Sequence, residues 1–176
     1  MAVMKRVMMD TIITIRFMPR FLQDGELRLR PVRWWNALFL SRIRSGTTLP
    51  ERRELPGLGS WLSYWWWMKK TFSFSYCIEL GAEPIGFVGI YELTSGETVK
   101  MALVIFDERY RRLGYGSRVF RIVAQAVKKH RIANWILVKV ESRNSGSIAF
   151  WQRNGFGEVA DSGGIKLMSV DLSGLE

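Results

Sequence analysis

The residues between Val104 and Val127 are the first group whose types and spacing could bind a ligand. An apolar, strand-like run ends there in an arginine-rich loop, and Gly114-x-Gly116 leads from the loop into a stretch of helical apolar spacing. The glycines permit a tight turn and leave their backbone N–H groups uncovered. Ser117 is expected to cap the helix, whose first-turn N–H groups stabilise an anion. Three arginines add charge to the approach: Arg109, Arg111 and Arg112. We predict a pyrophosphate site here, although a plain surface turn is the alternative.

Two familiar phosphate loops do not fit this segment. A P-loop requires Gly-Lys-Ser/Thr at the helix start, whereas Ser117 and Arg118 follow Gly116. The dinucleotide-binding fingerprint requires a third glycine, but Val119 occupies that position. Its glycines also follow the strand directly, whereas here a loop intervenes. The predicted anion site is therefore of another kind.

A second segment, from Val140 to Phe156, predicts a strand followed by a short capped helix. Asn144 is placed either to cap this helix or to bind a ligand amide. Asn154 and Gly155 supply a left-handed turn that ends the helix. Alone, this segment indicates a capped helix and no particular activity.

Together the two segments resemble the GNAT N-acetyltransferase superfamily. Its first motif, Arg/Gln-x-x-Gly-x-Gly/Ala, is matched by Arg111, Gly114 and Gly116. Its second motif, Asn-x-x-Ala/Ser followed by Gly-Phe, is matched by Asn144, Ser147, Gly155 and Phe156. The ribosomal-protein N-acetyltransferase-like branch is nearest in appearance. The resemblance implies an N-terminal extension over residues 1–25, an acetyltransferase domain over 26–172 and a tail over 173–176.

The resemblance implies acetyl-CoA as the acetyl donor and co-substrate. In such proteins the fourth strand binds the pantetheine arm through free backbone groups, as though the arm were an added strand. The loop and the second helix hold the rest of the cofactor. The residues expected to contact acetyl-CoA are Val104, Ile105, Phe106, Arg111, Arg112, Leu113, Gly114, Tyr115, Gly116, Ser117, Asn144, Ser147 and Trp151.

Direct acetyl transfer to a primary amine needs a base for the amine and an acid for the departing thiolate. The tyrosine acid common in the family is replaced by Trp151, so Ser147 is the expected thiolate donor. Glu97 is the expected base, and Glu92 and Glu141 are alternatives. Trp151, together with Lys139 in place of a glutamate of one branch, keeps open a second interpretation: an acyl-CoA-binding protein without catalysis.

The elements that must position these groups follow from the spacing of apolar residues. The expected fold is a mixed α/β (α+β) sheet of six to seven strands, mostly antiparallel, with helices on both faces. The helical connection from Phe106 to Trp135 is a crossover, so the fourth and fifth strands must be parallel, and the resemblance implies that they splay apart. Expected strands are Leu27–Pro31, Phe72–Ile78, Ile85–Leu93, Val99–Phe106, Trp135–Val140 and Ile165–Leu172; expected helices include Trp34–Ile43, Ser60–Lys70 and Ser145–Arg153.

Composition limits the remaining classes of function. A chain of 176 residues, 48% hydrophobic and 13% aromatic, suits one folded domain. With one cysteine, Cys77, and one histidine, neither a disulfide nor a metal site is expected. No apolar run has membrane-spanning length and no signal-peptide core is present, which favours a cytoplasmic location. The net charge of +10 suits either nucleic acid or a phosphate-bearing small molecule. The cations are dispersed without a nucleic-acid motif, so nucleic-acid binding is a lesser alternative.

The acceptor is less defined than the donor. Tryptophans mark the segment expected to line the acceptor side: Trp34, Trp35, Trp61, Trp65, Trp66 and Trp67. They suit stacking on a planar or sugar acceptor. Equally, Trp61 and Trp65 suit the core, which leaves Trp66 and Trp67 for a homodimer or membrane-surface contact. An amino sugar, a peptide N-terminus and another small amine all stay open, and the positive charge favours an anionic acceptor.

Overall fold

The computed structural model describes residues 18–33, 35–36, 60–94, 97–106 and 108–174. Within these residues the strands form a single sheet in the order β1-β2-β3-β4-β5-β6-β8-β7. The strands are β1 (Leu22–Asp24), β2 (Leu27–Pro31), β3 (Phe74–Leu80), β4 (Glu83–Thr94), β5 (Thr98–Ile105), β6 (Trp135–Glu141), β7 (Gly157–Ser162) and β8 (Ile165–Asp171). The expected helix Trp34–Ile43 lies almost wholly outside the described residues, as does most of the expected extension 1–25.

The prediction of six to seven strands was too low, since the described residues form eight. The two additional strands, β1 and β7, carry little apolar alternation. Strand β1 has only three residues, and every residue of β7 is exposed. A strand that buries neither face leaves no period of two in its sequence, so spacing could not reveal it. The mixed, mostly antiparallel sheet itself is confirmed.

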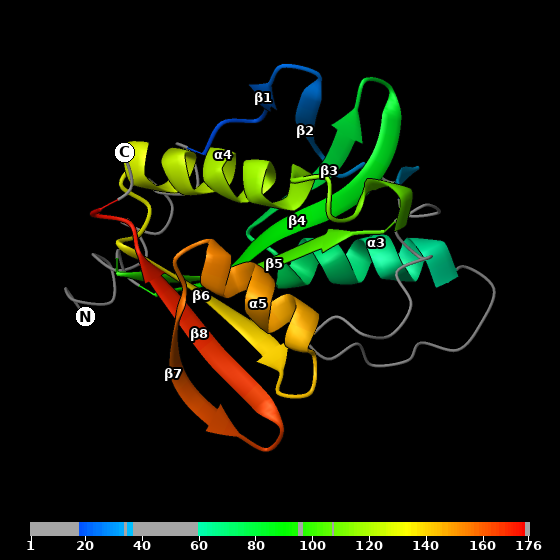
Figure 1. Cartoon of the computed structure of the whole chain (residues 1–176). Coiled ribbons are helices and arrows are strands. Elements are labelled where there is room, and N and C mark those ends of the chain that lie inside the picture. The colour runs from blue at the N-terminus through cyan, green and yellow to red at the C-terminus, as the bar shows by residue number, and fades with distance from the viewer. Residues whose placement is uncertain (1–17, 34, 37–59, 95–96, 107, 175–176) are drawn as a thin grey trace.

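Strands β5 and β6 form the one parallel pair among the described strands, and they separate along their length (Figure 1). Thr98, Val99 and Lys100 pair with Trp135, Ile136 and Leu137, and the pairing ends there. The opposite edge of β5 stays paired with β4 as far as Ile105. The predicted splay is therefore confirmed, and from Met101 onward β5 has a free backbone edge on its β6 side. We call the paired end of these strands the closed end and the separated end the open end.

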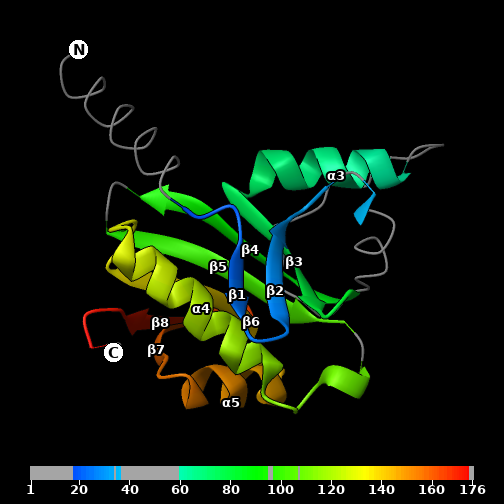
Figure 2. The same cartoon turned by 90° about the horizontal axis from the view of Figure 1, so that it is seen from above.

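Helices cover both faces of the sheet, as predicted (Figure 2). Helix α3 (Ser60–Thr71) lies on one face, and α4 (Tyr115–Lys129) and α5 (Ser145–Arg153) lie on the other. The larger core joins α4 and α5 to the sheet through residues such as Phe120, Val123 and Trp151. A smaller core under α3 contains Met68, Phe72 and Phe87, among others. No helix among the described residues is long and apolar enough to cross a membrane.

The tryptophans of α3 divide between core and surface, but not as the alternative of an outward Trp66–Trp67 pair supposed. Trp65 and Trp67 both pack against the smaller core, and Trp67 meets Phe72 edge-on at 5.9 Å between ring centroids. Trp66 is 56% exposed. Met68 faces the core, and two residues of helix rotate the chain by about 200°, so Trp66 points away while Trp67 lies at the flank. The side chain of Trp61 lies outside the described residues.

Candidate functional site

Helix α4 begins directly after a glycine at the end of the arginine-rich loop. Gly114 is the N-cap residue, with a φ of 85°, and no side chain caps the helix. The expectation that Ser117 caps this helix is therefore wrong, because the helix starts two residues earlier and Ser117 lies inside its first turn. A left-handed φ is readily adopted by glycine and strains other residues. Gly114 is thus required by the turn that delivers the helix end.

A run of backbone donors is left without a protein acceptor at this helix end. Across the described residues, none of the six N–H groups from Arg112 to Ser117 donates to a protein group. Nothing lies within 4 Å of a side chain built on Gly114. Free N–H groups at the positive end of a 15-residue helix form a site for an anion. The loop therefore has the donors that a pyrophosphate requires.

The side chain of Arg111 bonds to backbone carbonyls, whereas its charge suggests that it binds phosphate. Its Nε donates to the carbonyl of Ile105 at 3.0 Å, and its Nη2 donates to the carbonyl of Phe106 at 3.1 Å. The sequence favoured Arg111 as a residue that steers phosphates, but here the guanidinium ties the loop to the end of β5. Arg112 is exposed, with a φ of 61°, and its guanidinium has no ion-pair partner among the residues that the structure describes.

Replacing Arg111 by lysine should loosen the loop. An ammonium cannot reproduce two directed bonds from one planar fork. We expect the free energy of unfolding to fall by about 1–2 kcal/mol, on the scale of bonds to a charged group, and the dissociation constant for acetyl-CoA to rise. Urea denaturation and calorimetric titration measure the two effects. Arg109→Lys is the matched control, since Arg109 is exposed and pairs with Glu83 at 3.2 Å. Equal behaviour of both variants would contradict the clamp.

Two further residues contact the loop and the start of α4, and nothing in the sequence indicated either. Glu83, at the start of β4, accepts a hydrogen bond from the Tyr110 hydroxyl at 2.7 Å and pairs with Arg109. Phe150 of α5 faces the other glycine, because a Cβ built on Gly116 would lie 3.0 Å from the Phe150 ring. Gly116 therefore permits close approach of α4 and α5. Neither contact carries a sequence signal, since each joins segments distant along the chain.

Helix α5 brings Asn144 and Ser147 to the open end of β6. Asn144 is the N-cap residue, and its Oδ1 accepts a hydrogen bond from the backbone N–H of Ser147 at 3.0 Å. The predicted cap is confirmed. In the described part of the chain, Asn144 Nδ2 has no protein acceptor, and the half-buried Ser147 hydroxyl has no protein partner. Both groups are available to a ligand.

A comparison with protein families decides what this arrangement belongs to. The family described as "Acetyltransferase (GNAT) family" matches residues 35–156. The chain belongs to the GNAT acetyltransferase family. It is therefore a member of a family of enzymes that transfer acetyl groups from acetyl-CoA to amines. A search of curated proteins found no match.

Solved structures share the fold of this acetyltransferase at low sequence identity. Spermidine N-acetyltransferase from Vibrio cholerae, in complex with CoA and spermine, has a TM-score of 0.67 at 14% identity, covering 85% of this chain and 98% of that one. Ard1 from Thermoplasma volcanium has a TM-score of 0.65 at 16% identity, covering 83% and 97%. A putative acetyltransferase from Salmonella typhimurium, solved with acetyl-CoA, has a TM-score of 0.61 at 13% identity, covering 85% and 95%. At these identities the likeness shows the fold.

The three candidate carboxylates of the acetyltransferase are divided between the closed end and the open end of strands β5 and β6. Glu97 is exposed and directly precedes β5, and its carbonyl accepts the N–H groups of Asn134 and Trp135 at the closed end. The carboxylate of Glu92 is also at the closed end, where it pairs with Lys100. Glu141 is half-buried at the open end of β6 and contacts Arg143. Glu97 and Glu92 therefore share the closed end, whereas Glu141 neighbours the cap of α5.

Trp151 and Lys139, the two departures from the family pattern, differ in setting. The indole of Trp151 is 6% exposed and meets Phe120, Phe150 and Phe156 at centroid distances of 4.8–6.1 Å. Its contact with Phe120 holds α5 against α4, and the expected contact of Trp151 with the cofactor stays a prediction. Lys139 is exposed on β6. No group of three or more His, Cys, Asp or Glu side chains among the described residues could hold a metal ion.

Cys77 should be inert as a nucleophile. It is completely buried in the smaller core, and burial, with a smaller effect of Glu79, raises the pKa of its thiol to about 12. A raised pKa keeps the thiol protonated at neutral pH, and the thiolate is the reactive form. We expect no alkylation of the native protein by iodoacetamide at pH 8, and rapid alkylation in urea. Labelling of the native protein as fast as a free thiol would reopen an acyl-enzyme route.

Proposed function

We propose that this acetyltransferase moves the acetyl group of acetyl-CoA directly to a primary amine, without an acyl-enzyme. The observation that carries the proposal is the set of six free N–H groups from Arg112 to Ser117, at the open end of the separated strands. An anion bound there lies where a chain extending from it enters between β5 and β6. These two features suit the pyrophosphate and the pantetheine arm of one cofactor.

The length of the separated strands supports a position for the thioester. From Ile105 at the open end to Lys100 at the closed end, β5 spans five residue steps, or about 17 Å. An extended pantetheine arm anchored at the loop has a comparable reach. Its amides would bond to the free edge of β5 from Met101 to Val104, since the Ile105 carbonyl already accepts from Arg111. Asn144 Nδ2 would contact the arm from the other side. The acetyl group would then lie near the closed end.

Each bond and proton in the proposed reaction can be accounted for with acetyl-CoA, the amine and side chains of this protein. The amine nitrogen attacks the thioester carbonyl, a carbon–nitrogen bond forms, and the carbon–sulfur bond breaks. The proton of the amine passes to a carboxylate, and the thiolate is protonated from the Ser147 hydroxyl through a bridging water, because Ser147 lies toward the open end of β6. Glu97 stays our proposal for the base, with Glu92 as its neighbour at the closed end. Glu141 is about 13 Å from Leu137, measured as four strand residues, so it would act through water.

Substituting the carboxylates separates these assignments. Glu97→Gln should lower kcat at neutral pH and shift the limb of the rate profile set by the base, with little effect on the KM for acetyl-CoA. Glu92→Gln tests the neighbour in the same way, and Glu141→Gln serves as the comparison at the open end. Rate profiles from pH 6 to 10 measure the effect. If all three variants keep wild-type profiles, the proton leaves through water or substrate.

The acceptor is proposed to approach on the α3 face. Helices α4 and α5 close the opposite face of the sheet, whereas α3 covers the β3–β5 region. Structures of this fold include an enzyme crystallised with spermine, a polycation. The net charge of +10 repels a polycation and favours an anionic amine. We therefore place peptide N-termini with acidic residues and nucleotide-linked amino sugars ahead of polyamines.

A CoA-release assay tests the proposed function. Purified protein and acetyl-CoA are mixed with peptides, amino sugars, polyamines and aminoacyl compounds, and free CoA is measured with the acetylated product. We expect at least one primary amine to react. Binding of acetyl-CoA with no transfer to any amine would favour the acyl-CoA-binding alternative. Salt-dependent binding of random DNA or RNA without an effect of CoA would favour the nucleic-acid alternative.

A further inference from the structure

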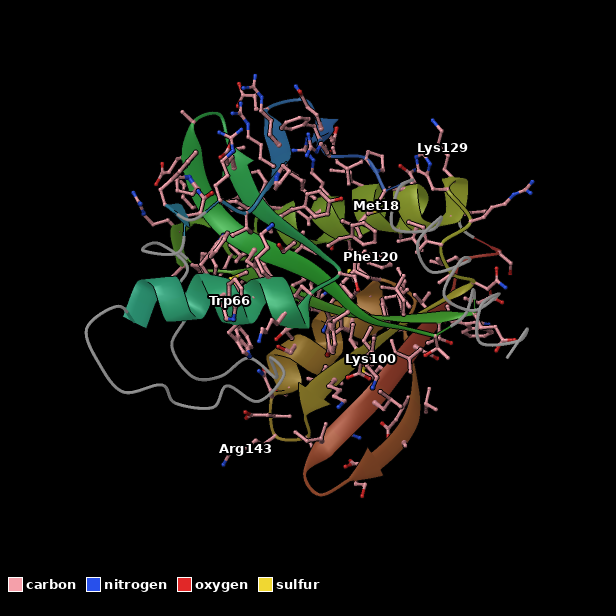
Figure 3. The ribbon with its side chains drawn as sticks, turned by 180° about the vertical axis from the view of Figure 1, so that it is seen from behind. Met18, Trp66, Lys100, Phe120, Lys129 and Arg143 are labelled. Atoms are coloured by element: carbon pink, nitrogen blue, oxygen red, sulfur yellow. The ribbon has the colours of Figure 1, made fainter. Side chains whose placement is uncertain are left out.

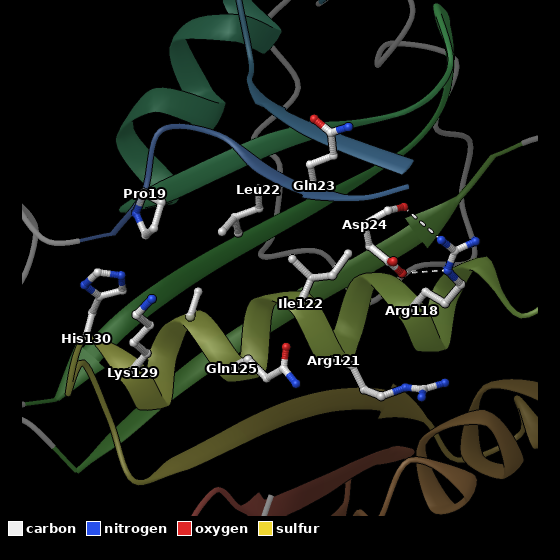
Figure 4. Close-up of a pocket in the computed structure, with 11 residues that line it drawn as sticks. Pro19, Leu22, Gln23, Asp24, Arg118, Arg121, Ile122, Gln125, Lys129 and His130 are labelled. Carbon is white, nitrogen blue, oxygen red and sulfur yellow. Dashed lines mark hydrogen bonds and ion pairs between the residues drawn. The ribbon is translucent and has the colours of Figure 1, made fainter. Parts of the chain in front are cut away.

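A hollow lies along one side of α4, between the helix and the segment that contains β1 (Figure 4). Its volume is about 520 Å³, within the range of pockets that hold small molecules. One wall is the segment from Pro19 to Asp24, and the other is a face of α4 from Arg118 to His130. Gly116, in the first turn of α4, faces Phe150 of α5 instead. The anion site therefore lies at the N-terminal end of α4, whereas the hollow lies along its side.

The outer wall of this hollow is held in place at several points. The Pro19 carbonyl accepts a hydrogen bond from the Tyr76 hydroxyl at 2.7 Å, and the preceding Met18 is 6% exposed within the core. At the other end, Arg118 donates to the Asp24 carboxylate and to the Asp24 carbonyl, both at 2.8 Å. The wall is thus anchored to β3 at one end and to α4 at the other. Small and flexible side chains, Ala126 and Gln125, leave the space between them open.

The charges lining the hollow are unbalanced. Its single carboxylate, Asp24, is engaged by Arg118, whose hydrogen bond holds the pKa of Asp24 below its usual value. Arg121 and Lys129 form no ion pair in the described part of the chain, although the charge of Arg121 also contributes to the lowered pKa of Asp24. His130 adjoins Lys129 at the Pro19 end. Leu22, Ile122 and Ala126 supply an apolar surface between the charged groups. Arg121 and Lys129 are eight residues apart on α4, or about 12 Å.

From this arrangement we infer that the hollow between Pro19–Asp24 and α4 binds a small amphipathic organic anion, with an acidic head group and an apolar body. Lys129 and His130 contact the head group at one end of the hollow, Leu22 with Ile122 contacts the body, and Arg121 at the other end adds to the positive field. The Gln125 amide lies between them as a hydrogen-bond donor. Neutral apolar compounds lack the charge contacts, and inorganic anions lack the apolar ones, so neither class matches the lining as well. This site is independent of the acetyl donor.

A pair of dyes that differ in charge tests the inference on the whole protein. The anionic probe is 8-anilinonaphthalene-1-sulfonate, and N-phenyl-1-naphthylamine is its neutral counterpart. We expect the anionic dye to bind more tightly and to remain bound at saturating CoA. Displacement of the dye by CoA, or equal affinity for the two dyes, would overturn the inference.

Matched variants locate the dye. Gln125→Glu places a negative charge in the hollow at nearly constant size, and we expect it to raise the dissociation constant of the anionic dye about tenfold. Arg121→Gln with Lys129→Gln should have an effect of similar size. Gln152→Glu on α5, and Lys69→Gln with Arg153→Gln, make the same charge changes at exposed sites elsewhere and should have little effect. If hollow and control variants bind the dye equally well, the site is not there.

Discussion

Replacing Gly114 by valine should remove most of the stabilisation that acetyl-CoA gives to this protein. At a cofactor concentration of 100 times the dissociation constant, binding to the native state stabilises by about 2.7 kcal/mol. For a chain of this size that corresponds to a rise in Tm of about 5–10 °C. Valine is strained at a φ of 85°, by about 1–3 kcal/mol, and its side chain would occupy the open space in front of the loop donors.

Gly163 provides the control for this substitution. Its φ is 60°, and a Cβ built on it also meets nothing within 4 Å, but it lies in the turn between β7 and β8. Gly163→Val should therefore lower the Tm of the free protein by a similar strain and leave the shift produced by acetyl-CoA intact. ATP at equal concentration is the ligand control and should stabilise less. A full acetyl-CoA shift in Gly114→Val would place the anion site elsewhere.

Ser147→Ala should lower kcat by about 10- to 1000-fold, near the usual contribution of one proton donor. The KM for acetyl-CoA should change little, because the loop N–H groups hold the pyrophosphate. The substitution retains the backbone N–H that Asn144 caps, so α5 keeps its start. The measurement is steady-state CoA release with the best acceptor from the panel.

Ser145→Ala, in the same first turn of α5 but exposed, is the matched control. It should keep the wild-type rate. If Ser147→Ala also keeps that rate, the thiolate leaves with a proton from water or from the acceptor. Such a result would remove the assignment of Ser147 and leave membership of the GNAT family untouched.

Local patterns predicted the central sheet well. The alternation over residues 72–78, the crossover from Phe106 to Trp135 and the apolar stripe of α4 are short-range signals, and the expected strand, parallel pair and helix formed there. The motif glycines were also informative, because Gly114 and Gly155 both adopt a positive φ. A backbone that requires glycine leaves a direct trace in the sequence.

Contacts between distant segments could not be predicted in this way. The bonds from Arg111 to the carbonyls of β5 depend on how the loop folds back, and arginine next to a phosphate motif suggests a different use. The cap at Gly114 shows that a serine near a helix start does not identify the first residue. The hollow beside α4 depends on the packing of β1, a three-residue strand without a pattern of its own.

The free inner edge of β5 also bears on how this protein avoids unwanted association. An unpaired strand edge commonly recruits a strand from another molecule and so promotes aggregation. Here the free stretch from Met101 to Val104 lies inside the sheet, with β4 on one side and β6 diverging on the other. A protein strand arriving with side chains would have to fit between two neighbours that meet a few residues further on. A thin chain of amides and methylenes fits there without such obstruction. The space between β5 and β6 therefore admits a narrow ligand and excludes a protein strand.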